Sequence, residues 1–271
     1  MTSFYTSLNG LKNAETDLRV ISHNIANAET AGFKKSNAQF ADIVTSGSSS
    51  DPRLSVGIGA TVSAINQDFS LGAIEQTGRS LDMSIDGDGF FTTRNTETNE
   101  VFFTRNGNMQ IDSAGNLQDP SGQRLQAFPV DATGTVTSTT PGDAVVPTTN
   151  AAGSDLSSVT IESNGIVLAS YADGSSDPVG RIALATFPAP DGLRSIGQTK
   201  WRATGISGAP QYDSPATGNR GQILSGTLER SNVDLAEEMV ALITAQRNFQ
   251  ANARAIDTST TISQTVINLQ R

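Results

Sequence analysis

The stretch DLAEEMVALITAQRNFQANARAIDTSTTISQTVINLQ, residues 234–270, decides the fold. Large apolar side chains recur in it every seven residues, at Leu235, Leu242, Phe249 and Ile256. This spacing places them on one stripe of an α-helix. The stripe is widened by Met239, Ala253, Ile262, Val266 and Leu269. As a helix the stretch would be about 55 Å long, several times the length of an average globular helix.

The predicted helix has a start signal. Asp234 is followed three residues later by Glu237, which resembles a capping box. The acidic pair Glu237 and Glu238 would also lie near the positive end of the helix dipole. We therefore expect the helix to begin at Asp234.

The other end of the chain repeats the pattern. Phe4, Leu11, Leu18 and Ile25 again step by seven residues. Leu8, Ala14 and Ile21 flank that line. The spacing predicts a second amphipathic helix. Gly10 weakens its first turns, and Gly32 is expected to end it.

The middle of the chain has a period of two. Leu81, Met83 and Ile85 alternate with polar residues, which is typical of a half-buried strand. Asn106-Gly107 and Asn164-Gly165 each predict a hairpin turn between strands. We expect residues 71–211 to form an antiparallel β domain.

The composition also divides the chain. Residues 130–157 are rich in Ser and Thr, and no Lys or Arg occurs from 126 to 180, so a flexible excursion is expected there. Residues 45–52, TSGSSSDP, are a second flexible candidate. The predicted fold class is α+β. Its terminal helical domain comprises 1–32 and 232–271. Extended connections are expected at 33–70 and 212–231.

Charge and residue types exclude several functions. The formal net charge of −9, with 14 Arg and 4 Lys, disfavours nucleic-acid binding. The absence of Cys and the single His23 argue against thiolate or histidine metal sites and against Ser-His-Asp catalysis. No stretch is apolar for long enough to insert in a membrane, and no cleaved signal peptide is expected at the start. We expect no enzyme activity, no cofactor and no metal.

Three isolated features have ordinary interpretations. Asp86-Gly87-Asp88-Gly89 resembles a calcium loop only in part, because Phe90 and Phe91 occupy positions for a ligand and a glycine, so a turn is favoured. His23 is expected at a polar surface or interface. Trp201 is expected to be a buried anchor of the β domain.

The two heptad stripes are the most informative pattern. One interpretation is that the helices cover the core of the β domain. The favoured interpretation is a coiled coil between the termini, extended by contacts with neighbouring copies in a homopolymer. The candidate polymer-interface residues are Phe4, Leu8, Leu11, Leu18, Ile21, Ile25, Leu235, Met239, Leu242, Phe249, Ile256, Ile262 and Leu269.

Several blocks resemble one family. HNIANAETAGFK at 23–34 is similar to the N-terminal motif of bacterial flagellar rod and hook proteins, with His23 in place of the more common Asn. The other similar blocks are TGRSLD at 77–82, GDGFF at 87–91, TRNG at 104–107, SNVDLAEEMV at 231–240 and AQRNFQAN at 245–252. Together they bracket nearly the whole chain.

Within this family, residues 232–235 and 250–253 are most similar to hook proteins. Hook proteins usually carry an outer mid-chain domain, and only 130–157 occupies that place here. The resemblance therefore implies a hook subunit lacking most of that domain, with a distal rod subunit as the alternative. Residues 45–52 fall where rod proteins carry an insertion. A monomeric β-rich binding or adhesive protein is the alternative of another class.

The resemblance implies a structural polymer. Its subunits would leave the cell through the flagellar type III export apparatus without a cleaved signal, and would reach the extracellular hook or basal body. Terminal helices would form an inner tube, and a hook would act as a universal joint that transmits torque. Other axial proteins of the rod, the hook-filament junction and the hook cap would be partners.

Overall fold

A computed structural model of the chain describes residues 2–44 and 57–269, except for the side chains of residues 2, 3, 266 and 269. The segment 45–52, expected to be flexible, lies outside the described residues. The chain divides into two compact units. The helical unit comprises residues 1–28, 35–68 and 233–271, and the β unit comprises 29–34 and 69–232.

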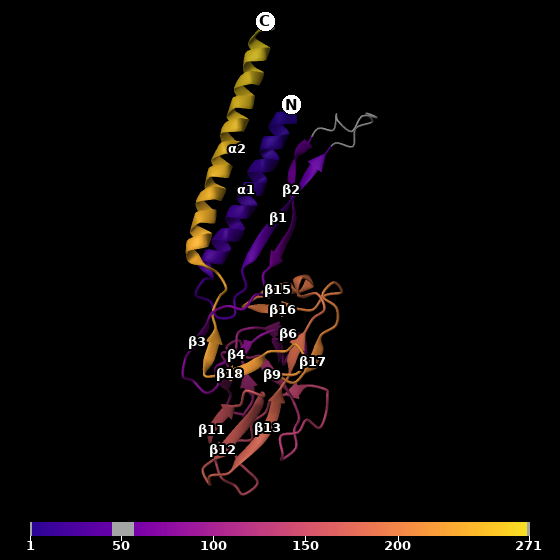
Figure 1. Ribbon diagram of the computed structural model, residues 1–271, viewed down its shortest axis with the longest axis vertical. Coiled ribbons are helices and arrows are strands. Elements are labelled where there is room, and N and C mark those ends of the chain that lie inside the picture. Colours follow the sequence, from indigo (N-terminus) through magenta and orange to yellow (C-terminus); the bar gives the residue numbers. More distant parts are fainter. Residues whose placement is uncertain (1, 45–56, 270–271) are drawn as a thin grey trace. The chain divides into compact units, whose positions relative to one another are not determined.

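The helical unit contains two helices and one hairpin. Helices α1 (Thr2–Ala26) and α2 (Leu235–Leu269) lie side by side (Figure 1). Strands β1 (Ser36–Val44) and β2 (Gly57–Gln67) pair as an antiparallel hairpin that also contacts α1. The predicted fold class is confirmed, because the terminal helices contact each other and the chain between them forms an antiparallel β unit.

The start of α2 follows the sequence signal, whereas the end of α1 does not. The Asp234 carboxylate accepts the backbone N–H groups of Ala236 at 2.8 Å and Glu237 at 3.2 Å, which satisfies two otherwise unpaired donors. Helix α1 ends at Ala26, so the prediction that Gly32 ends it was wrong. Gly32 has a φ of +68° and lies against the backbone of Arg105 and Asn106, where a Cβ would not fit.

The β unit contains a 13-stranded antiparallel sheet in its described residues. Its main path runs β11 (Leu156–Ile161), β12 (Ile166–Tyr171), β13 (Ser176–Ile182), β9 (Arg124–Phe128), β5 (Phe90–Arg94), β6 (Val101–Thr104), β16 (Lys200–Arg202) and β15 (Arg194–Gly197). The strands that join off this path are β7 (Gln110–Ile111), β8 (Leu117–Gln118), β10 (Gly142–Asp143), β14 (Leu184–Thr186) and β17 (Gln211–Asp213).

Two further strand pairs complete the unit. β4 (Met83–Asp86) pairs with β18 (Gln222–Ser225), and β3 (Ile74–Gln76) pairs with β19 (Thr227–Glu229). The period-two pattern correctly predicted β4, but the strand is not half-buried. Ser84 is also buried and shares a hydrogen bond of 2.7 Å with Thr227.

The two Asn-Gly turns have different outcomes. The turn at Asn164-Gly165 connects paired strands β11 and β12, as predicted. The hairpin predicted at Asn106-Gly107 is wrong, because β6 pairs with β5 and β16 whereas β7 pairs with β8. A Cβ on Gly107 would lie 1.7 Å from the Met83 carbonyl oxygen. This glycine is needed for a close backbone approach rather than for a hairpin.

Two apolar clusters form the core of the β unit. The larger contains Phe91, Leu125 and Ile182. The smaller surrounds Trp201, which is buried as predicted and packs edge-on against Phe90 with ring centroids 5.8 Å apart. Aromatic pairs in this arrangement contribute beyond their buried area.

The Ser- and Thr-rich stretch 130–157 contributes to the larger cluster. Its Ala144 and Val146 are buried there. Its Asp143 binds Arg94 through two hydrogen bonds, of 3.0 and 2.5 Å, and binds Arg124 at 3.0 Å. Desolvation raises the pKa of Asp143, but hydrogen bonds from these arginines and from Gln126 outweigh it and leave the pKa below its usual value.

Replacing Asp143 should therefore destabilise the β unit in a pH-dependent way. Because the folded-state pKa is lowered, the stabilisation is present above the ordinary pKa of 3.8 and is lost as the pH falls through the folded value. We expect Asp143→Asn to lower the unfolding free energy by roughly 1–2 kcal/mol at pH 7, and the difference between the two chains to shrink as the pH falls below about 3.8. Urea unfolding from pH 7 to pH 3 measures this, with exposed Asp191→Asn as the control. A pH-independent difference would contradict the assignment.

Candidate functional site

The helix pair brings together part of the predicted interface. Ile21 is buried, whereas the half-buried members are Leu8, Leu11, Leu18, Ile25, Leu242 and Ile256. The exposed members are Phe4, Leu235, Met239, Phe249 and Ile262. The side chain of Leu269 lies outside the described residues. The predicted stripe is therefore only partly covered by its own chain.

Small residues lie at the centre of the contact between the helices. Ala14 and Ala245 are buried, and Ala245 is only 1% exposed. A Cβ on Gly10 would lie 2.6 Å from the Asn252 side-chain oxygen, so the helices approach closely there. Sequence reasoning treated Gly10 as a weak point and missed Ala245 and Asn252. Their seven-residue spacing, from 245 to 252, was the available signal.

A buried polar contact joins the same helices. The Asn24 amide donates to the Glu238 carboxylate at 3.3 Å and to the Ser36 carbonyl oxygen at 2.9 Å. Its oxygen accepts the Ser36 N–H at 3.0 Å. Asn24 and Glu238 are 1% and 6% exposed. Asn24 lies off the seven-residue apolar line, so the sequence pattern did not predict this contact.

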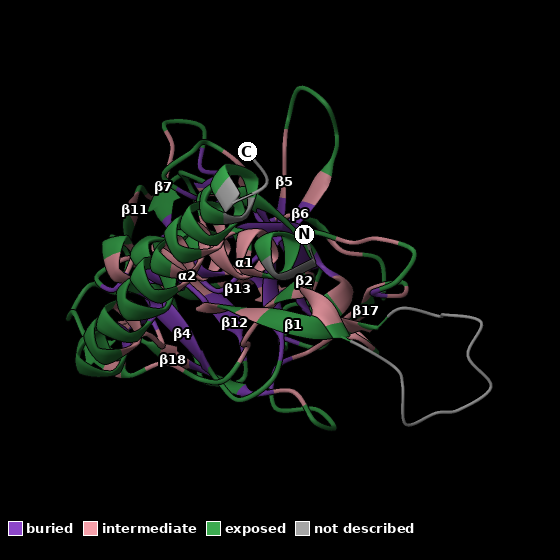
Figure 2. Cartoon of the chain, turned by 90° about the horizontal axis from the view of Figure 1, so that it is seen from above, coloured by how far each residue is buried: buried purple, intermediate pink, exposed green. Residues whose placement is uncertain are grey.

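A second apolar face of α2 has no partner within the described chain. Leu235, Met239, Val240 and Ile243 are exposed, with Val240 at 66%. Figure 2 shows exposed positions along most of α2. Val240 and Ile243 were not among the predicted interface residues because they lie off the seven-residue line. A contiguous exposed apolar patch on a long helix marks an interaction surface.

The end of α2 extends past α1 (Figure 1). Gly10 lies opposite Asn252 and Asn24 opposite Glu238, so the antiparallel register places Thr2 near position 260. Residues 261–269 of α2 therefore have no part of α1 beside them. Ile262 and Ile267 are exposed in this free end.

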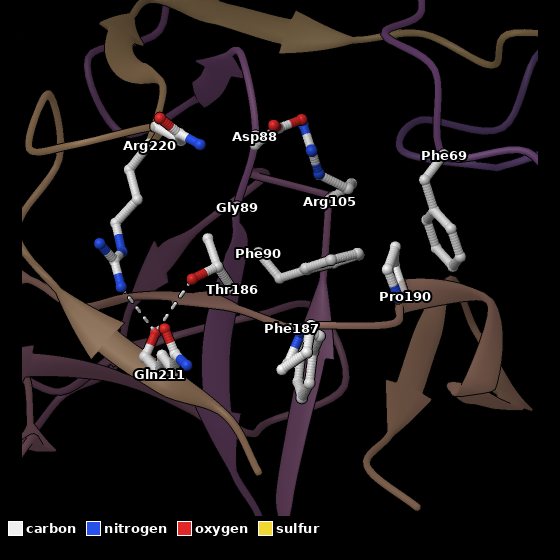
Figure 3. Close-up of a pocket in the computed structure, with 12 residues that line it drawn as sticks. Phe69, Asp88, Gly89, Phe90, Arg105, Thr186, Phe187, Pro190, Gln211 and Arg220 are labelled. Atoms are coloured by element: carbon white, nitrogen blue, oxygen red, sulfur yellow. Dashed lines mark hydrogen bonds between the residues drawn. The ribbon is translucent and has the colours of Figure 1, made fainter. Parts of the chain in front are cut away.

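The β unit has a groove of about 550 Å³, shown in Figure 3. Phe90, Phe187, Arg105 and Arg220 contribute to its lining. Arg220 and Thr186 both donate to the carbonyl oxygen of Gln211, at 3.2 and 3.4 Å. Its described lining contains no His, Ser or Lys, and the hydroxyl of its Thr186 donates to a backbone carbonyl oxygen.

A buried charge cluster lies deeper in the β unit. The Lys34 ammonium donates to the Glu229 carboxylate at 2.5 Å and to the Ser70 carbonyl oxygen at 2.6 Å. Arg105 reaches the other carboxylate oxygen at 3.5 Å. Burial lowers the pKa of Arg105, and the charges of Glu229 and Asp88 oppose that shift. The cluster joins segments from three distant parts of the sequence.

The fold and these surfaces define an α+β protein whose terminal helix pair presents an exposed apolar face. Among residues 2–44 and 57–269, no group of three or more His, Asp or Glu side chains could hold a metal ion. No described helix is long and apolar enough to span a membrane. The distinctive features are a terminal helix pair with an exposed apolar face and an antiparallel β unit.

Comparisons with known proteins identify the family. Residues 4–34 match the family model described as flagella basal body rod protein. Residues 84–169 match the flagellar hook protein FlgE/F/G D1 domain, and residues 224–269 match the flagellar basal body rod FlgEFG protein C-terminal region. The chain is 36% identical to the flagellar basal-body rod protein FlgG of Bacillus subtilis, across 100% of both chains.

Two more relatives agree. The chain is 30% identical to the rod protein FlgG of Borreliella burgdorferi, covering 100% of this chain and 99% of the relative. It is 28% identical to the hook protein FlgE of Salmonella typhimurium, covering 99% of this chain and 100% of the relative. The chain therefore belongs to the flagellar basal-body rod and hook family, whose members are structural proteins of the bacterial flagellum and not enzymes.

The charge cluster yields a prediction. Lys34→Met would leave the Glu229 carboxylate buried without its closest cation. We expect the unfolding free energy of the full chain to fall by about 3–5 kcal/mol, as when one partner of a buried ion pair is removed. Urea unfolding of dilute monomer measures this, and exposed Lys12→Met is the control. Equal stability of the two variants would show that the cluster contributes nothing specific.

Proposed function

We propose that this chain is a subunit of the distal flagellar rod. The observation that carries the proposal is its full-length match to a rod protein. That alignment spans 282 positions for the whole chain, whereas the alignment with the Salmonella hook protein needs 412 positions for 99% of the chain. A large part of the hook protein thus has no counterpart here. The comparisons favour the rod alternative over the hook interpretation that the sequence motifs suggested.

The β unit supports this choice. A hook protein with its outer domain removed would leave a short connection that packs against nothing. Here the stretch 130–157 contains a strand, two buried core residues and the Asp143 ion pairs. It is an integral part of the β unit, which fits a chain that never carried the outer domain.

Assembly would use the terminal helices. The seam between α1 and α2 buries small side chains, whereas the exposed apolar face of α2 and its free end are left uncovered by the described part of the subunit. Burial of that face against neighbouring copies would drive polymerisation. The predicted interface residues thus divide into a seam within the subunit and a face between subunits. Export through the type III apparatus and contacts with other axial proteins remain predictions from the family.

Deleting the gene for this chain in its own bacterium distinguishes the two axial assignments. We expect basal bodies whose rods stop short and carry no hook, because a hook has nothing to grow from when the distal rod is missing. Electron microscopy of isolated basal bodies measures the rod length, with the restored gene as control. Full-length rods that lack only the hook would establish the hook interpretation instead.

The exposed apolar face of α2 predicts that a substitution there can block assembly without affecting folding. Val240→Asp places a charge on a side chain that is already 66% exposed, so the subunit should keep its helicity and melting temperature. Assembly should fail, because the charge would be buried unpaired between subunits. Sedimentation and negative-stain microscopy measure polymer, and circular dichroism measures the fold.

Leu11→Asp is the matched comparison at a half-buried seam position. It should loosen α1 from α2 within the subunit, so that trypsin cleaves the less ordered backbone after the exposed residues Lys12 and Arg19 faster than in the natural chain. Normal polymer from Val240→Asp would exclude the exposed face of α2 as the assembly surface.

A further inference from the structure

The terminal helix pair has a competing register. Apolar residues that repeat every seven positions allow two helices to slide by seven residues and still bury a similar stripe. In the observed register, Gly10 lies opposite Asn252 and Asn24 opposite Glu238. The two contacts are separated by the same number of residues on both helices, from 10 to 24 in α1 and from 238 to 252 in α2.

Burial of apolar surface does not by itself exclude a slide toward the end of α2. A shift of seven residues would place Gly10 opposite Ser259 and the first turns of α1 opposite Ile262 and Ile267. Both isoleucines are exposed in the observed register, at 59% and 64%. Their burial would offset the loss of contact at Leu242, which is half-buried in the observed register and would be uncovered by the shift. Apolar burial alone therefore does not single out the observed register.

The Asn24 contact opposes that slide. Its amide forms two hydrogen bonds with the backbone of Ser36, at the start of β1, and a third with Glu238 of α2. After the shift, Asn24 would face Ala245, and Glu238 would lie beyond the end of α1 at Ala26. The hydrogen bond between Asn24 and Glu238 would be lost, and Asn24, still held against Ser36, would face an apolar side chain without its third partner, which is unfavourable for a buried polar group.

We propose that Asn24 and Glu238 set the register of the terminal helix pair. Ser36 holds Asn24 in position through the backbone of β1, and Gly10 admits the Asn252 side chain in the same register. The register determines how much of α2 stays free for neighbouring subunits, and this last consequence rests on the proposed rod function. The role is positional, because neither side chain belongs to the exposed apolar face.

Disulfide trapping in the full chain tests the proposal, because the natural sequence contains no Cys. Gly10→Cys with Asn252→Cys reports the observed register. Gly10→Cys with Ser259→Cys reports the shifted one. Each pair is oxidised in dilute chain, and peptide mass spectrometry identifies the linked segments and separates intramolecular from intermolecular bonds.

With Asn24 and Glu238 intact, we expect only the first pair to oxidise. In a chain that also carries Asn24→Leu and Glu238→Leu, the disulfide between positions 10 and 259 should form about tenfold more than in the chain with Asn24 and Glu238 intact, while helicity is retained. Glu238→Gln keeps a hydrogen-bond acceptor for Asn24 and should keep the observed register. Ser22→Leu with Arg247→Leu adds the same number of leucines at exposed positions and should not change either pair.

If the disulfide between positions 10 and 259 forms no more in the double-leucine chain than in the chain with Asn24 and Glu238 intact, the proposal is overturned. If that chain does not melt cooperatively, Asn24→Ala gives the same test, because it removes all three hydrogen bonds without adding bulk. The readout is made on dilute monomer and does not depend on assembly. If this chain is not a rod subunit, the result of the disulfide experiment is unaffected. If Asn24 and Glu238 do not set the register, the rod proposal still stands.

Discussion

One buried carboxylate organises the β unit. The Glu229 side chain binds the ammonium of Lys34, the backbone N–H of Gly72 at 3.0 Å and the guanidinium of Arg105, while its carbonyl oxygen accepts the N–H of Gly32 at 2.8 Å. Chain segments that are distant in sequence therefore converge on one charge. The chain passes between the helical unit and the β unit four times, after residues 28, 34, 68 and 232. Lys34 and Ser70, which lie beside two of these passages, are bonded to each other within the cluster.

Local patterns predicted the elements better than their contacts. The heptads of both helices, the cap at Asp234 and the turn at Asn164-Gly165 are encoded by a few neighbouring residues, so the sequence alone was sufficient. The end of α1 and the loop at Gly107 were wrong because a distant segment determines each of them. Gly32 lies against the Arg105–Asn106 backbone and Gly107 against Met83, and no local pattern contains that information.

In the candidate interface, too, the local pattern predicted the elements but not their contacts. The seven-residue step found the stripe but could not say which part the chain itself would cover. Leucines at half-buried positions flank a seam whose centre is Ala14, Ala245 and Gly10, because small residues let the helices approach closely. Large side chains at these central positions would force the two helices farther apart. Asn24 lies off the apolar stripe and is buried because β1 covers α1 on another side.

The charge cluster of the β unit and the small-residue seam of the helix pair suit an assembling subunit for one physical reason. Isolated helices are marginal in water, since nucleation is unfavourable and most helix stability comes from tertiary packing. A seam of small residues buries little apolar area, so the pair gains only modest stability inside one chain. The apolar area that could stabilise it further, on Met239, Val240, Ile243 and the free end of α2, is left for other molecules. The β unit, with its own apolar core and charge cluster, does not depend on that gain. Folding of the β unit and ordering of the helices are therefore separable, and the second is the step that neighbouring subunits would drive.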